Sequence, residues 1–192
     1  MESGSRTNAE RARELVLAAY GQIADRGFEG LRTRDVANEV GVNIATLHYY
    51  FPTKEALIVG VLQHAMERFR TSLQPHGAPE SQLRNYLRAT RKLLRDEPEL
   101  GAVMTELALR ATRDPAIRKF LDAMYAQWHD SVRGLLKRAA RDGHLRADLD
   151  SDATAALIVT ALNGIAVPQV GDQRRGDLAL RELERWLGIS RR

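Results

Sequence analysis

Residues 33–57 read TRDVANEVGVNIATLHYYFPTKEAL, and this stretch decides the fold. Thr33 can cap a short helix that stops at Gly41, and Asn43 can cap the next helix, residues 44–50. Gly41 provides the backbone freedom that a tight turn between the two helices requires. Two short helices joined by a glycine-containing turn are typical of a helix-turn-helix.

The segment before this stretch predicts a third helix that packs against the other two. Apolar residues recur there at helical spacing, namely at Ala12, Leu15, Val16, Ala19, Tyr20 and Ile23. We expect this helix to end near Gly27. Ala37 is small enough to allow close helix crossing, while Val42 and Leu47 can face the shared core.

The helix over residues 44–50 has a second face that the core does not use. Thr46, Tyr49 and Tyr50 carry hydroxyl groups that can hydrogen-bond phosphates, and Ile44 and Ala45 can contact thymine methyl groups. The alternative is that the tyrosines are core aromatics. The consecutive residues Tyr49, Tyr50 and Phe51 cannot all point inward from one helix. This favours a core position for Phe51 and nucleic-acid contact for Tyr49 and Tyr50.

The net charge of residues 1–57 does not by itself support nucleic-acid binding. The chain carries a formal charge of +4, but residues 1–57 contain seven basic and eight acidic residues and net −1. The prediction therefore rests on which charged and polar side chains face the phosphates, since a domain-wide basic surface is missing.

The motif closely resembles the signature of the TetR/AcrR family of transcriptional regulators. The residues that carry the resemblance are Gly41-Val42, Leu47, Tyr50-Phe51, Lys54-Glu55 and Leu57, together with residues 19–30. The signature covers about the first third of the chain; the remainder matches in length and helical layout. The resemblance implies an all-α dimer that represses transcription from a palindromic operator and is released by a small apolar or amphipathic ligand.

The resemblance also implies roles for individual residues. Thr33 would cap its helix and touch a phosphate, and Tyr50 and Lys54 would contact phosphates. The positions that would read bases or backbone are Asn43, Ala45, Thr46, His48 and Tyr49. The family most often has Tyr where this chain has His48, so the contact made at that position is open.

The rest of the chain predicts further helices and no strand. Apolar periodicity indicates helices over residues 54–73, 83–94, 100–107, 115–142 and 152–167 and from about residue 176, separated by proline- and glycine-containing breaks. The expected fold is all-α with about nine helices. We expect a helix-turn-helix domain over residues 1–54 and a helical ligand-binding and dimerisation domain over residues 55–192.

Methionine and aromatic side chains provide a candidate ligand pocket in the second domain. The set comprises Met66, Phe69, Met104, Leu107, Phe120, Met124 and Trp128. Such side chains adapt to irregular apolar ligands. The alternative for each of them is an ordinary core position, so the hypothesis is that some of the set lines a cavity.

The last two helices form a candidate dimer interface. Small residues on residues 152–167 allow close packing, and the last helix adds bulk; the predicted interface residues are Leu157, Ala161, Gly164, Leu183 and Trp186. In a monomer these helices would expose a sizeable apolar patch. Two-fold pairing would bury the patch and present two recognition helices to successive major grooves.

No catalytic, metal or cofactor motif stands out. The chain has no cysteine, no His-Glu-x-x-His, no glycine-rich phosphate loop and no Glu-x-x-His pair for a di-iron bundle. We expect no enzyme activity, no cofactor and no membrane partner, and a cytoplasmic location. A helical-bundle enzyme and a helical scaffold without DNA binding are the competing hypotheses. The scaffold leaves the polar, aromatic face of residues 43–50 unexplained.

Overall fold

The computed structural model describes residues 7–72, 77–167 and 173–189, which contain nine α-helices and no strand. The predicted all-α fold is therefore confirmed. In chain order the helices are α1 Asn8–Gly30, α2 Thr33–Val40, α3 Ile44–Tyr50, α4 Lys54–Ser72, α5 Pro79–Asp96, α6 Pro98–Ala111, α7 Pro115–Arg141, α8 Ser151–Ala166 and α9 Gln173–Trp186.

Local sequence explains where most of these helices begin. Thr7 and Glu10 form a reciprocal capping box at the start of α1, and Asp114 and Asp150 cap α7 and α8 through their carboxylates. Prolines occupy the first turn of α5, α6 and α7, where a missing N–H costs nothing. The prediction that Thr33 caps α2 is wrong: Arg32 is the N-cap residue and makes no side-chain cap bond, because α2 begins one residue earlier than expected.

Helix α1 is interrupted at Gly27, close to its predicted end. Gly27 has φ 67° and ψ 179°, so the helical geometry breaks there and a last turn follows to Gly30. An L-residue rarely adopts this backbone conformation, which explains the glycine. The break sends Phe28 into the core instead of along the helix surface.

The described part of the protein contains two hydrophobic clusters. The first cluster comes from α1, α2, α3, α4, α6 and the first half of α7, with Leu93 from α5. The second cluster comes from α5, the second half of α7, α8, α9 and the segments that follow α7 and α9. Tyr125, in the middle of α7, packs against both clusters.

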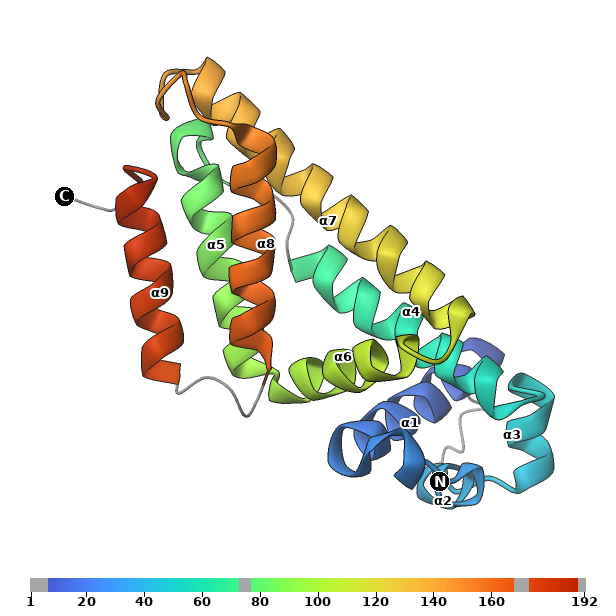
Figure 1. Ribbon diagram of the computed structural model, residues 1–192. Coiled ribbons are helices and arrows are strands. Elements are labelled where there is room, and N and C mark those ends of the chain that lie inside the picture. Colours follow the sequence, from blue (N-terminus) through green and yellow to red (C-terminus); the bar gives the residue numbers. More distant parts are fainter. Residues whose placement is uncertain (1–6, 73–76, 168–172, 190–192) are drawn as a thin grey trace.

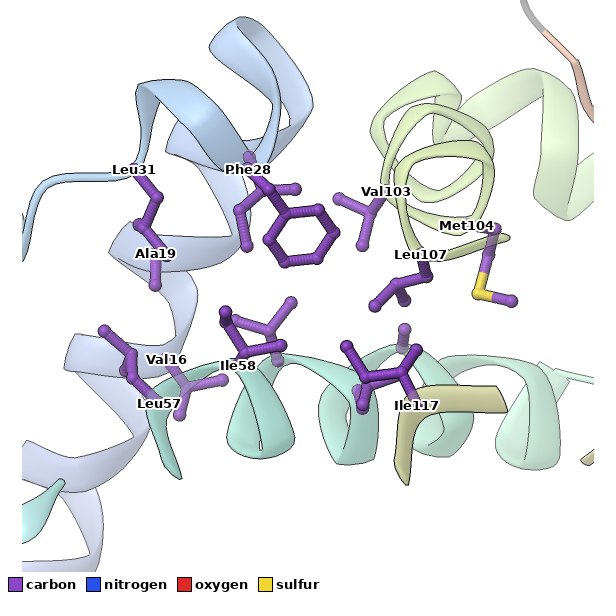
Figure 2. Close-up of a cluster of buried hydrophobic side chains, with 14 of the residues drawn as sticks. Val16, Ala19, Phe28, Leu31, Leu57, Ile58, Val103, Met104, Leu107 and Ile117 are labelled. Atoms are coloured by element: carbon purple, nitrogen blue, oxygen red, sulfur yellow. The ribbon is translucent and has the colours of Figure 1, made fainter. Parts of the chain in front are cut away.

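The first cluster crosses the proposed domain boundary. Figure 2 shows the Phe28 ring directed toward Val103 and Leu107 of α6, with Ile58 of α4 beneath it. Val103 and Leu107 are fully buried, and Phe28 is nearly so. The helix-turn-helix unit therefore completes its core with side chains from α4 and α6.

The arrangement places the two ends of the molecule far apart. Helices α1, α2 and α3 gather at one end, and α5, α8 and α9 stand side by side at the other (Figure 1). Helices α4, α6 and α7 run between the two ends. No helix among the described residues is both long and apolar enough to cross a membrane.

Candidate nucleic-acid interface and cavity

The turn between α2 and α3 fixes the orientation of α3. Gly41 adopts the left-handed conformation, with φ 74° and ψ 35°, and the Val42 N–H donates to the Ala37 carbonyl oxygen at 2.9 Å. Leu47 is fully buried and anchors α3 against the other helices. The turn chemistry expected at Gly41 is thus present.

Asn43 caps α3 as the sequence predicts. Its Oδ1 accepts hydrogen bonds from the Thr46 N–H at 2.7 Å and from the Thr46 hydroxyl at 3.0 Å. The cap holds the first turn of α3 rigid, so the backbone N–H groups of this turn point outward at a fixed angle.

The remaining face of α3 is open. Ala45, His48 and Tyr49 are exposed, and 75% of Tyr49 is accessible. The Tyr49 ring meets the Tyr50 ring edge-on, with 5.1 Å between their centroids. A large aromatic side chain held in the open on a capped helix is unusual for a purely structural position, because exposed aromatic surface costs solvation free energy.

Two of the predicted phosphate contacts already have protein partners. The Tyr50 hydroxyl donates to Asn8 Oδ1 at 2.9 Å, which ties the start of α1 to α3. Lys54 Nζ donates to the Phe28 carbonyl oxygen at 3.2 Å. Thr33 lies half-buried in the first turn of α2. Ala45, His48 and Tyr49 are therefore the predicted contact residues that are exposed and have no described side-chain hydrogen bond.

Helix α6 holds the turn at Phe28 from the opposite side. Glu106 Oε2 accepts the Phe28 N–H at 3.2 Å, and the Arg110 guanidinium lies over the Phe28 ring at 5.5 Å. Phe28 thus receives contacts from α6 at its N–H and ring and from Lys54 of α4 at its carbonyl. Sequence reasoning missed Glu106, because its partner lies 78 residues away in the chain.

A cavity of about 570 Å³ lies where the two hydrophobic clusters meet. Six of the seven predicted pocket residues line it: Met66, Phe69, Met104, Phe120, Met124 and Trp128. The prediction for Leu107 is wrong, since that side chain is fully buried and faces Phe28 on another side of α6. The volume is in the range of pockets that hold drug-sized ligands.

The cavity also has lining residues that the sequence prediction missed. Tyr86 and Tyr125 add two aromatic walls, and Arg138 and Asn163 add polar groups. Tyr125 stacks on Trp128 with 6.2 Å between ring centroids. Burial raises the pKa of both tyrosines, so their phenols stay protonated. Tyr125 lies three residues before Trp128 and could have been found on the same helical stripe; Tyr86 comes from another helix and carries no such signal.

Helices α8 and α9 leave apolar side chains uncovered. The exposed face of α8 consists of small residues around Leu157, of which 51% is accessible, and includes the predicted Gly164; Ala161 is half-buried beside them. Trp186 on α9 is 52% accessible. Leu183 does not belong to this surface: it is 9% accessible and packs into the second cluster, because it lies on the inner face of α9.

Two family models match most of the chain. The model of bacterial regulatory proteins of the tetR family matches residues 15–61, which contain the helix-turn-helix. The model of the tetracyclin repressor-like C-terminal domain matches residues 73–163, which contain α5 to α7 and most of α8. Both matches agree with the resemblance that residues 33–57 suggested.

Curated relatives and solved structures agree with these matches. The HTH-type transcriptional regulator RutR of Escherichia coli is 31% identical over 102 residues, 50% of this chain and 48% of RutR, so the alignment spans about half of that relative. The regulator CymR of Pseudomonas putida is 26% identical over 175 residues, 87% of this chain and 85% of CymR. A transcriptional regulator from Saccharomonospora viridis, solved in complex with choline, has the same fold, with a TM-score of 0.77 and 21% identity over 93% of this chain and 97% of that one. The chain belongs to the TetR family of bacterial regulatory proteins.

Proposed function

We propose that this protein is a transcriptional repressor that binds a palindromic operator as a dimer and leaves it when a small ligand fills the cavity. The observation that carries the proposal is the open face of α3, where His48 and Tyr49 project from a helix held by the Asn43 cap and the Gly41 turn. In this proposal α3 enters the major groove, and its first turn and Lys54 contact phosphates. No catalytic step is part of the proposal.

The proposed dimer pairs α8 and α9 with the same helices of a second copy. The small side chains on the outer face of α8 permit close helix approach, and Leu157 and Trp186 provide apolar area to bury. Leu178 extends the apolar surface of α9, where it is as exposed as Trp186. An isologous interface of this kind would set the two α3 helices on one face of the DNA.

The proposed effector site is the cavity between the two clusters. A ligand there would touch Met104 of α6 and Met66 of α4, and the same two helices hold Phe28 through Glu106 and Lys54. A ligand that favours one arrangement of α4 and α6 therefore shifts the population of DNA-binding conformers. Residues 1–54 would form the DNA-reading domain and residues 55–192 the ligand-binding and dimerisation domain.

The test begins with selection of duplexes from a randomised pool by the full chain, followed by fluorescence-anisotropy titration of the selected sequence. We expect a palindromic site, an affinity that falls steeply with salt, and a loss of at least about tenfold in Tyr49→Ala. Tyr49→Phe removes only the hydroxyl, so it distinguishes the contribution of the hydroxyl to DNA binding from that of the ring. Tyr49 suits this test because its described contact is only the ring edge of Tyr50.

A sedimentation experiment tests the dimer independently of DNA. We expect the wild-type chain and Tyr49→Ala to sediment as dimers at micromolar concentration, and Leu157→Arg to sediment as a folded monomer, because a charge in the pair interface is left without a partner. A monomeric wild-type chain would refute the dimer. The repressor would be refuted if the selected duplexes contained no palindrome and Tyr49→Ala bound DNA as tightly as the wild type.

A further inference from the structure

The cavity follows α7 for a long distance. Its α7 wall recurs at helical spacing from Phe120 through Met124 and Trp128 to Leu135 and Arg138. Phe120 and Gly134, which also line it, are 14 residues apart, which corresponds to about 21 Å along the helix axis. A cavity of about 570 Å³ spread over such a length is narrow and elongated.

The two ends of this cavity differ in polarity. Toward the Phe120 end the lining is mostly apolar, with Met66, Met104, Phe120 and Met124, although Gln63 and Glu67 of α4 lie beside Met66. Toward the other end, the exposed side of α7 contributes Asp130, Ser131 and Arg138. An elongated cavity with one apolar end and one polar end fits an amphipathic molecule.

The carboxylates of the cavity wall are already paired with arginines. Glu67 forms two hydrogen bonds with Arg70, at 2.7 and 2.9 Å, one turn along α4. Asp130 accepts a hydrogen bond at 2.7 Å from Arg133, one turn along α7, which also donates to Asp152 at 3.2 Å. A cationic ligand would therefore have to compete with an arginine for either carboxylate.

Arg138 is in the opposite situation. Within the described part of the chain its guanidinium has no ion-pair or hydrogen-bond partner, although it lines the cavity. One guanidinium nitrogen lies 3.4 Å from the position that a Cβ on Gly134 would occupy, so the side chain folds back along α7 over the glycine. This places an uncompensated positive charge at the polar end of the cavity.

We propose that the effector is an elongated amphipathic anion, with its apolar body along the methionine-rich end of the cavity and its carboxylate on Arg138. A planar carboxylate matches the fork of a guanidinium and binds it through two parallel hydrogen bonds. The inference rests on the proposed effector role of the cavity and adds the chemical class of the ligand. It also separates this chain from the choline complex of its structural neighbour, in which the bound molecule is a cation.

Three probes with the same alkyl tail and different head groups test the charge: dodecanoate, dodecan-1-ol and dodecyltrimethylammonium. Isothermal titration calorimetry on the full chain gives their dissociation constants. We expect dodecanoate to bind at least about tenfold more tightly than the other two. Equal or tighter binding of the ammonium compound, or no binding of any probe, would overturn the proposal.

Two variants localise the effect. Arg138→Gln keeps the length and polarity of the side chain and removes its charge, so we expect it to lose the preference for dodecanoate and to keep dodecan-1-ol within about twofold. Arg141→Gln removes the same charge one turn later, at a side chain that does not line this cavity, and we expect it to bind like the wild type. Full retention of dodecanoate affinity in Arg138→Gln would refute the assignment of the head group.

The same probes distinguish this inference from the proposed repressor. Dodecanoate binding that depends on Arg138, in a chain that shows no selective DNA binding, would support the ligand class and refute the repressor. Selective DNA binding in a chain that does not bind dodecanoate would leave the repressor in place and refute the anionic effector.

Discussion

The two hydrophobic clusters of this protein are built differently. The first cluster joins segments that are far apart in sequence, since Phe28 of α1 packs on Val103 and Leu107 of α6. The second cluster is a bundle of α5, α7, α8 and α9 that leaves the outer faces of α8 and α9 uncovered. Exposed apolar side chains also occur on helices of the first cluster, at Leu17, Val59 and Leu109. The first cluster therefore differs mainly in joining helices from distant parts of the chain, whereas the second carries the α8 and α9 faces of the proposed dimer.

This difference assigns separate tasks to the two ends of the molecule. The first cluster positions α3, so on the proposed function we expect a change inside it to alter DNA binding. The second cluster supports the outer faces of α8 and α9, so on the proposed dimer we expect a change inside it to alter self-association. The cavity lies between them and is lined by residues from both, including Tyr125, which packs against each cluster. A ligand in that position contacts both halves at once.

Truncating one leucine in each cluster is the strongest test of this separation. Leu107 in the first cluster and Leu162 in the second are both fully buried. We expect Leu107→Ala and Leu162→Ala each to lower the free energy of unfolding by about 2–5 kcal/mol in urea titrations. At temperatures where both variants remain folded, Leu107→Ala should weaken DNA binding and stay dimeric, and Leu162→Ala should weaken the dimer.

The separate tasks of the two clusters would be refuted if both variants lost DNA binding and dimerisation to the same extent. Loss of DNA binding and of the dimer in both, in proportion to the lost stability, would mean that the clusters act as one core. Ile158→Ala, a second fully buried position on α8, provides a repeat of the Leu162 measurement at an independent site.

Gly27 allows a more local test, at the contact between the first cluster and α6. A Cβ at this position would lie 2.9 Å from Glu106 Oε2, and the backbone has φ 67° and ψ 179°. We expect Gly27→Ala to cost about 1–3 kcal/mol from the backbone alone and to displace the Glu106 carboxylate from the Phe28 N–H. The change in the urea midpoint measures the cost.

Gly41→Ala is the matched control, because Gly41 also has a positive φ but no atom lies within 4 Å of its would-be Cβ. Its backbone is in the ordinary left-handed region, where an L-residue costs about 1–2 kcal/mol. If Gly27→Ala destabilised the protein no more than Gly41→Ala does, the contact with Glu106 would have no energetic weight.

The sequence predicted those features that depend on neighbouring residues. Proline and aspartate at the starts of α5 to α8 and the Asn43 cap act within one turn, so the helix layout and the turn at Gly41 could be inferred from local sequence. The one-residue error at Thr33 has the same local character, because either residue can begin a helix whose apolar face starts at Val36.

Features that depend on tertiary packing could not be inferred in this way. Leu107 and Met104 lie one turn apart on α6, yet Met104 reaches the cavity and Leu107 is buried against Phe28. Leu183 and Trp186 are one turn apart on α9 and also differ: Leu183 is buried, whereas Trp186 is exposed. Helical periodicity identifies the apolar residues of a helix but does not say which neighbour each of them meets.

The smallest expected effect is a pH dependence of stability that arises from His64, beside the first cluster. His64 on α4 contacts Tyr20 of α1 edge-on, with 5.2 Å between ring centroids. Burial lowers its pKa from the ordinary value of 6.5, and the charges of Arg68 and Arg13 lower it further, against an opposing contribution from Glu97. Because the folded state resists protonation more than the unfolded state does, stability should fall as the pH drops below about 6.5.

The measurement compares thermal midpoints of the wild type and His64→Gln between pH 8 and pH 5. The difference between the two curves isolates His64 from the other four histidines, and we expect the wild type to lose more stability on acidification than the variant does. Parallel curves would show that the protonated ring is tolerated. In that case the compensating group is expected to be Glu97, which favours protonation of His64. Its carboxylate already accepts a hydrogen bond from Arg68, so neutralising the imidazolium would weaken that bond.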